Sequence, residues 1–427
     1  MADTSKRTHD GGKRKPATAG AVPREGLALF GGKPVRRDLL PFGVPRIDED
    51  AISEAAAALR SGWISTGPRV SEFEKAFAKY QRMKYAVATS SCTAALHLAL
   101  LALGVGKGDE VITTPLTFAA TANVIVHAGA KPVFADVDVL TGNLDPAQVE
   151  RKVTRRTKAI IAVHLAGRPC DIGALRDIAE RRNLVLIGDC AHALEARYGG
   201  KPVAKWANAS CFSFYATKNL TTGDGGMLAT DDQAVAATAR MLGLHGMELA
   251  EPPHLAARTL RHYRIIAAGF KYNMTDIEAA IGIRQLERIE EYHARRAAIA
   301  AAYTSAFADL PLGLPAPVGR GERHAWHLYQ ILVDADRLDC DRDAFGRALF
   351  AEGIGCSIHF PALHLEPFYA SLLGHRRGDF PNAELVADRT LSLPLSARLS
   401  DADVADVVAA VRKVSRAFNV TEVRSHQ

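Results

Sequence analysis

A repeated alternation of short apolar runs and amphipathic helical stretches between residues 85 and 188 constrains the fold of this chain more than any other feature. Runs rich in β-forming residues predict strands at 85–89, 110–113, 133–135, 158–163 and 184–188. Helical patterns follow the first four strands, at 92–103, 118–127, 146–152 and 172–181. This rhythm is typical of βαβ units, so we expect an α/β protein with a mainly parallel sheet covered by helices.

Two domains are expected, because 427 residues exceed what one hydrophobic core usually serves. The sheet belongs to a large domain, residues 26–285, and a smaller α+β domain follows at residues 286–427. A long helix at 275–307 would bridge the two. In the smaller domain the pattern predicts strands at 326–333 and 354–359 and helices at 343–351 and 401–414. Ahead of the sheet, a helix is expected from Asp48 to Gly62, with Ile52, Ala55, Ala56 and Leu59 on one face.

The composition excludes several classes of protein. Much of the net charge of +6 lies in residues 1–25, a basic segment without apolar periodicity that we expect to be a disordered tail. Such a tail can touch nucleic acid or anionic lipid, but a solvated terminus is the simpler interpretation, so neither partner is expected. No apolar run is long enough for a transmembrane helix, and no secretory signal is seen. The six cysteines lack paired spacing, which indicates free thiols and a cytoplasmic protein.

The polar residues that follow the predicted strands are the candidates for a functional site. Ligands of open α/β sheets bind at the carboxyl ends of the strands. The segments at those ends are 90–93, 114–118, 164, 189–192 and 213–218. The chain has no GxxxxGK[ST] motif, and its Gly104-Val-Gly-Lys-Gly108 segment precedes a strand, so a mononucleotide or dinucleotide fingerprint is unsupported.

Lys218 is the most informative of these residues. It follows an apolar run containing Ser213, and a glycine-rich turn, Gly223-Asp-Gly-Gly226, comes after it. A lysine at a strand end among aromatic residues is poised for a lowered pKa, and a neutral amine can form an imine with a carbonyl. The alternative is an ordinary solvated lysine. The serine before Lys218 and the glycines after it favour the interpretation as a reactive lysine, because both suit a nearby phosphate.

Three further positions are consistent with a charged, planar ligand. Asp189 ends an apolar strand, where its carboxylate needs a partner such as a protonated ring nitrogen, although it could simply cap the next helix. The segment 90–93 lies between a strand and a helix, where free N–H groups bind phosphate or serve only as a helix cap. Phe118 follows the next strand and is either a ring-stacking residue or part of the core.

The histidines were also considered as metal ligands. They show neither an HExxH motif nor a Cys/His spacing, so no metal is expected and a polar lining for a substrate is favoured. The histidines in question are His164, His192, His327, His359 and His364.

Taken together, the ordered motifs resemble the sugar aminotransferases of the DegT/DnrJ/EryC family, from about residue 28 to residue 414. The likeness rests on segments spread along the chain, including 62–68 (Gly-Trp-Ile-Ser-Thr-Gly-Pro), 106–111, 133–138, 163–167, 188–192, 210–226, 244–247, 271–277 and 392–395. Two departures are mild: Gly188 stands where the family often has Glu, and Asp224 where it often has Glu. The resemblance implies a fold type I architecture with a seven-stranded sheet, and pyridoxal 5'-phosphate as cofactor.

The resemblance also implies a role for individual residues. Lys218 matches the lysine that holds the cofactor and later moves the proton, and Asp189 matches the partner of the pyridine nitrogen. The remaining cofactor positions are Cys92, Thr93 and Ser213 at the phosphate, Phe118 on the ring, His192 near the ring hydroxyl, and Asn273 reaching the neighbouring subunit's phosphate. His164 and His327 match positions on the substrate side. A homodimer with shared active sites is therefore expected.

The implied reaction moves an amino group from glutamate, which leaves as 2-oxoglutarate, to a nucleotide-linked keto-sugar. Segments 269–285 and 326–361 look most like members acting at carbon 4 of UDP-linked sugars. Carbon 3 of a dTDP-linked sugar and a cyclitol ketone stay open as alternatives. A non-catalytic regulator that keeps the fold and a metal hydrolase that uses the histidines are the alternatives from other classes. An intact Lys218, Asp189 and phosphate loop argue against the regulator, while the hydrolase predicts metal-dependent activity and no visible chromophore.

Overall fold

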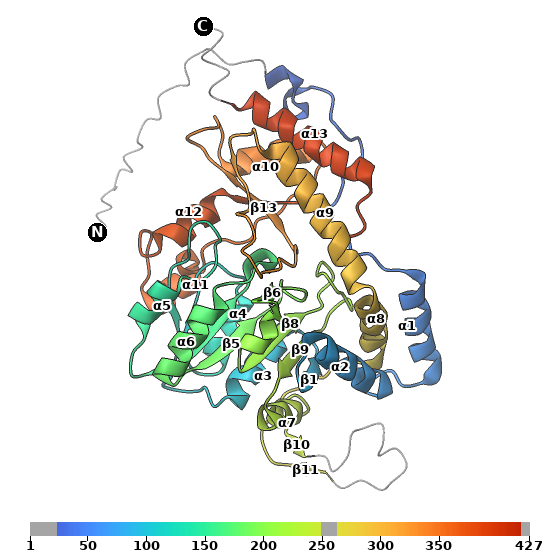
Figure 1. Ribbon diagram of the computed structural model, residues 1–427, viewed down its shortest axis with the longest axis vertical. Coiled ribbons are helices and arrows are strands. Elements are labelled where there is room, and N and C mark those ends of the chain that lie inside the picture. Colours follow the sequence, from blue (N-terminus) through green and yellow to red (C-terminus); the bar gives the residue numbers. More distant parts are fainter. Residues whose placement is uncertain (1–23, 249–262, 420–427) are drawn as a thin grey trace, which may run out of the picture.

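A seven-stranded mixed sheet forms the centre of the molecule in the computed structural model, which describes residues 24–248 and 263–419 (Figure 1). The strand order is β1-β9-β8-β5-β4-β2-β3. Only β9 runs antiparallel to its neighbours, so the expected mainly parallel sheet is confirmed. The strands are β1 Tyr85–Thr89, β2 Glu110–Thr113, β3 Lys131–Phe134, β4 Thr157–Val163, β5 Val185–Asp189, β8 Ala209–Ser213 and β9 Gly226–Thr230.

Helices cover both faces of this sheet. Successive strand residues point to opposite faces, so Ile161 packs in one apolar cluster with α3 and α7, while Ile160 packs in another with α5 and α6. Phe73 and Phe77 of α2 cover the β1 end of the second face together with α8. These helices are α2 Pro68–Gln81, α3 Cys92–Ala102, α4 Ala120–His127, α5 Pro146–Lys152, α6 Ile172–Arg182, α7 Gln233–Leu242 and α8 Asp276–Glu287. None of the helices in the described ranges is long and apolar enough to cross a membrane.

The C-terminal part is a smaller α+β unit. Its three-stranded antiparallel sheet has the order β12-β13-β14 and shares an apolar core with α9, α10 and α13, into which Leu27 and Leu40 from the start of the chain also pack. The elements are α9 Ile289–Phe307, β12 Leu312–Gly313, β13 Tyr329–Val333, α10 Arg342–Ala351, α11 Pro367–Leu373, α12 Pro381–Arg389, β14 Thr390–Leu393 and α13 Asp401–Ala417. Short pairs β6 Arg197–Tyr198 with β7 Lys201–Pro202, and β10 Met247–Glu248 with β11 Arg264–Ile265, complete the strands.

Some sequence expectations need correction. The helix predicted at 275–307 is two helices, because the backbone leaves the helical conformation at Arg288, where α8 ends and α9 begins. The strand predicted at 354–359 is absent: Ile354 and Ser357 form only isolated bridges. Helices α2 and α7 and the strand β9 were not predicted. Most of the expected tail lies outside the described residues, while residues 24 and 25 belong to a 3₁₀ turn, η1 Arg24–Gly26.

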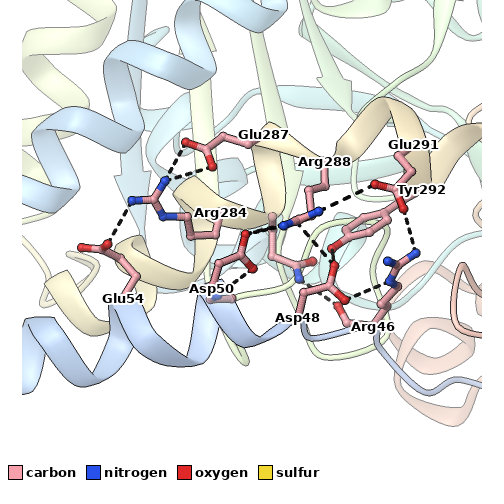
Figure 2. Close-up of polar contacts among 11 residues, drawn as sticks. Arg46, Asp48, Asp50, Glu54, Arg284, Glu287, Arg288, Glu291 and Tyr292 are labelled. Atoms are coloured by element: carbon pink, nitrogen blue, oxygen red, sulfur yellow. Dashed lines mark hydrogen bonds and ion pairs between the residues drawn. The ribbon is translucent and has the colours of Figure 1, made fainter.

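Helix α1 (Glu49–Ser61) packs on α8 in an unexpected orientation. The face that carries Ile52 and Leu59 is exposed, and Ala51 and Ala58 are the buried residues. A network of charged and polar side chains fastens α1 and the residues before it to α8 and α9 (Figure 2). Its contacts are Arg284 with Glu54 and Glu287, Arg288 with Asp48, Asp50 and Glu291, Arg46 with Asp48 and Glu291, and Tyr292 with Asp48.

Candidate active site

Asp189 lies at the carboxyl end of β5, in the middle of the sheet, and is buried. Its Oδ2 accepts a hydrogen bond from Thr121 Oγ1 at 2.8 Å, and its Oδ1 accepts one from the Ala191 N–H at 3.2 Å. Among the described residues, no cationic side chain forms an ion pair with this carboxylate. Burial raises the pKa of Asp189 above its usual value, although the bond from Thr121 opposes that shift. The site thus holds a buried carboxylate that a cationic ligand would stabilise.

The amino end of helix α3 opens onto the same edge of the sheet. The chain enters it from β1 through Ser91, whose side chain caps the helix by accepting the Ala94 N–H. The first N–H groups of a helix, here those of Cys92 and Thr93, have no partner within the helix and attract anions. Gly226, at the start of β9, passes so close that a Cβ there would lie 2.5 Å from the Cys92 nitrogen. Only glycine fits this approach, which explains the last residue of the glycine-rich turn.

Lys218 stands five residues beyond the end of β8 at Ser213. Its backbone N–H donates to the Tyr215 carbonyl at 2.9 Å, which folds the segment into a turn. Burial lowers the pKa of Lys218 from 10.5 to about 8, and the negative charge of Asp189 opposes this shift. A sizeable fraction of the amine is therefore neutral near physiological pH and able to act as a nucleophile or base.

His192 lies three residues after Asp189 in the chain and is buried between two other rings. Its ring centroid is 4.5 Å from that of His327 and 5.8 Å from that of Phe360. Burial and the charge of Lys218 lower its pKa well below the usual value, so the ring is neutral. Its Nδ1 accepts the Ala166 N–H at 3.3 Å, which places the ring proton on Nε2. His192 is therefore a hydrogen-bond donor at Nε2.

The two histidines expected on the substrate side are both buried but have different neighbours. His164 is completely buried, and its Nδ1 accepts the Cys170 N–H at 3.1 Å, so its Nε2 carries the proton. That Nε2 is buried and has no hydrogen-bond partner among the residues that the structure describes. His327 adjoins His192 and contacts Asn219 through Nδ1 at 3.1 Å. His327 thus lies beside the Lys218 segment, whereas His164 lies in the interior next to Cys170.

Phe118 and Asn273 occupy different surroundings. The Phe118 side chain is 63% exposed, and its ring centroid is 6.0 Å from that of Phe360, so it extends over the edge of the sheet and not into the core. Asn273 pairs through its backbone with Thr89 at the end of β1, and its side chain donates to Thr66 Oγ1 at 2.7 Å. Asn273 Oδ1 accepts from Lys271.

Sequence reasoning missed several residues that complete the site. Thr121 on α4 supports Asp189, Asn219 links His327 to the rest of the protein, and Phe360 contacts both His192 and Phe118. The only signal for Asn219 was its place next to Lys218. Nothing local marked Thr121 or Phe360, because their partners are distant in the sequence. Within the described ranges, no group of three or more His, Cys, Asp or Glu side chains is arranged to hold a metal ion.

Comparison with known proteins agrees with this geometry. The model of the DegT/DnrJ/EryC1/StrS aminotransferase family matches residues 45–412. The spore coat polysaccharide biosynthesis protein SpsC of Bacillus subtilis is 46% identical over 381 residues, which make up 89% of this chain and 98% of SpsC.

Solved structures are similar over most of their length. The pyridoxal-phosphate form of the sugar aminotransferase Spr1654 from Streptococcus pneumoniae matches with a TM-score of 0.83 and 33% identity, covering 88% of this chain and 99% of that one. DesI, solved in the presence of its TDP-sugar product, matches with a TM-score of 0.81 and 34% identity, covering 94% of this chain and 100% of that one.

The side chains at the carboxyl edge of the sheet fit pyridoxal phosphate. The buried carboxylate of Asp189 lacks a cationic partner, which suits a protonated pyridine nitrogen. The free end of α3, with Thr93, suits the phosphate, and the partly neutral amine of Lys218 suits the aldehyde. Phe118 leaves a ring face open for stacking. With the family match over residues 45–412, the chain belongs to the DegT/DnrJ/EryC1/StrS family of pyridoxal-phosphate-dependent aminotransferases.

Proposed function

We propose that this aminotransferase takes the amino group of glutamate and delivers it to carbon 4 of a nucleotide-linked keto-sugar, with a UDP-linked sugar as the expected acceptor. The observation that carries the proposal is the set of neutral imidazoles beside Lys218. Burial lowers the pKa values of His192, His327 and His359. A neutral imidazole offers one donor and one acceptor, which suits the hydroxyl and carbonyl groups of a sugar. The names of SpsC and DesI, which refer to polysaccharide biosynthesis and a TDP-sugar, support a sugar acceptor.

Lys218, Asp189 and His192 have distinct parts in this reaction. When bound, the cofactor supplies a carbonyl that accepts the amino group and a ring that withdraws electrons. Lys218 would hold the cofactor through Nζ. As a free amine, the same Nζ would take the proton from the amino-bearing carbon of the donor and, in the second half of the reaction, give a proton to the carbon of the acceptor that receives the amino group. Asp189 keeps the pyridine nitrogen protonated by charge pairing. His192, a donor at Nε2, would hydrogen-bond the ring hydroxyl.

The test is an absorption spectrum of the purified protein with and without glutamate, followed by a panel of keto-sugars. We expect a yellow protein whose band near ~420 nm is lost on adding glutamate and returns when a UDP-4-keto-sugar is added. Mass spectrometry of the product then confirms the amino sugar. Recovery only with a dTDP-3-keto-sugar or a cyclitol ketone would move the proposal to those acceptors, and loss of the band with another amino acid but not glutamate would replace the donor.

We also propose a homodimer in which Asn273 of each subunit reaches the cofactor phosphate of the other. In its own subunit, Asn273 belongs to the lining of a cavity of about 720 Å³ beside α2 and α7. The cavity also includes Thr66, the hydrogen-bond partner of Asn273. A cavity of this size, bounded by α2, β1 and α7, is suited to receive a segment of a second copy.

A further inference from the structure

A buried ion pair is connected to the active-site histidine His327 through one amide. Glu195 lies in the loop after β5 and Arg296 on α9; their side chains are 0% and 4% exposed, and the Arg296 guanidinium donates to Glu195 Oε1. Asn219 Nδ2 donates to the other carboxylate oxygen, Glu195 Oε2, at 2.8 Å. Asn219 directly follows Lys218. The chain of contacts that begins at Arg296 on α9 therefore ends at the residue beside the catalytic lysine.

The partners of Asn219 fix which way its amide faces. Glu195 Oε2 and the Ala325 carbonyl oxygen, at 2.8 and 3.0 Å, are both acceptors, so the two hydrogens of Nδ2 must point to them. The amide oxygen is then left for His327, whose Nδ1 lies 3.1 Å away. An oxygen cannot donate, so His327 Nδ1 must carry the proton.

His327 therefore has its lone pair on Nε2. Burial, followed by the charge of Lys218, lowers the pKa of His327 well below the usual value, so the ring holds a single proton. No described residue forms a hydrogen bond with its Nε2. The adjacent His192, at a ring separation of 4.5 Å, is in the opposite tautomer, with its proton on Nε2. The two histidines thus present a donor and an acceptor side by side.

We propose that Glu195 and Asn219 are positioning residues that hold His327 in the Nδ1–H tautomer, so that its Nε2 accepts a hydrogen bond from a hydroxyl of the acceptor substrate. The hydroxyl rests on the proposed function, but the tautomer does not. A neutral histidine in water has no such fixed polarity; here the carboxylate of Glu195, together with the Ala325 carbonyl, sets the direction in which Asn219 and His327 hydrogen-bond.

The substitution Glu195→Gln tests the relay without changing its shape. The new amide keeps its oxygen on Arg296 and turns its NH₂ toward Asn219, where it no longer accepts a hydrogen bond. Only the Ala325 carbonyl then holds the Asn219 NH₂, and a flipped Asn219 would present Nδ2 to His327, which would accept at Nδ1 and carry its proton on Nε2. In holoenzyme labelled with ¹⁵N-histidine, we expect the His327 signal, assigned by its loss in His327→Asn, to move from the Nδ1–H tautomer toward the Nε2–H tautomer. We expect kcat/KM for the acceptor to fall about tenfold or more through KM, with the glutamate half-reaction little changed.

A second variant keeps the test decisive if Glu195→Gln does not fold, since it leaves Arg296 without its counter-charge. Asn219→Leu removes the acceptor of His327 Nδ1 and should release the tautomer. Asn208→Ala, which loses a side-chain bond to the Leu186 N–H at the other end of β5, is the control and should leave the tautomer unchanged.

A wild-type His327 with its proton on Nε2, or a tautomer unaffected in folded Asn219→Leu, overturns the proposal. The expected tautomer in a protein that turns over no keto-sugar would refute only the proposed acceptor.

Discussion

Burial favours the uncharged form of both Lys218 and Asp189, the two central titratable groups of the site. It lowers the pKa of Lys218 and raises that of Asp189, and the attraction between the two groups only partly opposes each shift. For Lys218 this produces a reactive amine. A buried Asp189 carboxylate is costly unless a cation pairs with it, and the protonated cofactor ring would be that cation. The residues of the site are thus adjusted to a ligand that brings an aldehyde and a positive charge together.

The lowered pKa of Lys218 predicts how the cofactor-free enzyme responds to pH. Only the neutral amine attacks an aldehyde, and the neutral fraction rises as the pH passes about 8, against 10.5 for an ordinary lysine. The rate of pyridoxal phosphate uptake, followed by its absorbance, should therefore increase up to a pH near 8 and level off above it. Lys218→Ala should take up no cofactor covalently. A rate still rising steeply beyond pH 10 would show that the amine is not shifted.

Replacing Asp189 by Asn should separate cofactor binding from catalysis. The amide keeps the size and the Thr121 contact but cannot pair with a protonated nitrogen. Loss of one such electrostatic contribution typically costs about 10²–10³ in kcat. We expect kcat for the glutamate half-reaction to fall by roughly this factor, with Thr121→Val giving a much smaller loss. Equal kcat values for Asp189→Asn and the wild type would contradict the assigned role.

The places of three candidate residues could be predicted from the sequence because their patterns are local: Asp189 ends a strand, Thr93 lies in the first turn of a helix, and Lys218 lies in the turn after β8. Thr121, Glu195 and Asn219 could not be assigned roles in this way, since what matters about them is a hydrogen-bond partner many residues away. A histidine tautomer is even harder to predict from the sequence, because it depends on every successive hydrogen bond that leads to the ring.

Among the elements, those with strong periodicity or terminal signals were predicted most successfully. The break between α8 and α9 was missed because the apolar pattern continues across Arg288, and the break itself lies in backbone geometry. Helix α2 had a readable signal in Pro68 at its first turn. Its amino end is capped from a distance: buried Asp276 at the start of α8 accepts the N–H groups of Gly67, Arg69 and Val70. A cap supplied by another helix leaves no trace in the local sequence.

The contact between the α1 region and α9 predicts a pH-dependent contribution to stability. Tyr292 is buried and donates to Asp48 Oδ2 at 2.8 Å (Figure 2). Burial alone would raise the pKa of Asp48, but the bonds from Tyr292 and Arg46 outweigh it, so the pKa lies below 3.8. A carboxylate with a depressed pKa stabilises the fold above its unfolded pKa and loses this effect as the pH falls through the folded value.

Tyr292→Phe should therefore lower the free energy of unfolding by about 1–2 kcal/mol at neutral pH. The difference from the wild type should shrink as Asp48 is protonated below pH 3.8, the usual value for that group. Urea unfolding at several pH values measures this. Tyr303→Phe is the matched control, because its hydroxyl donates to the Pro394 carbonyl, which does not titrate. A loss for Tyr292→Phe that is the same at all pH values would exclude Asp48 as its source.

At the scale of the whole molecule, the long α9 connects the sheet to the C-terminal unit (Figure 1). Ile289 and Tyr292 at its start pack in the core beside α2, while Tyr303 and Phe307 at its end pack in the C-terminal core. Arg296, between these two halves, forms the buried pair with Glu195 that leads to the active site. A shift of α9 relative to the sheet would therefore reach His327 through Glu195 and Asn219. In this way the packing of the two parts would affect the hydrogen bonding of His327.

The proposed sharing of active sites between subunits gives a test that no single-site variant can. In a two-fold dimer, each site would take Lys218 from one subunit and Asn273 from the other. Lys218→Ala and Asn273→Ala homodimers should each be impaired, because each carries the same defect in both sites. If the two proteins are unfolded together in equal amounts and refolded, half of the dimers should be hybrids. Each hybrid has one site with both changes and one with neither, so the mixture should regain about a quarter of wild-type activity. Activity no greater than the mean of the two variants, in a preparation shown by light scattering to be dimeric, would place Lys218 and Asn273 in the same site of one subunit.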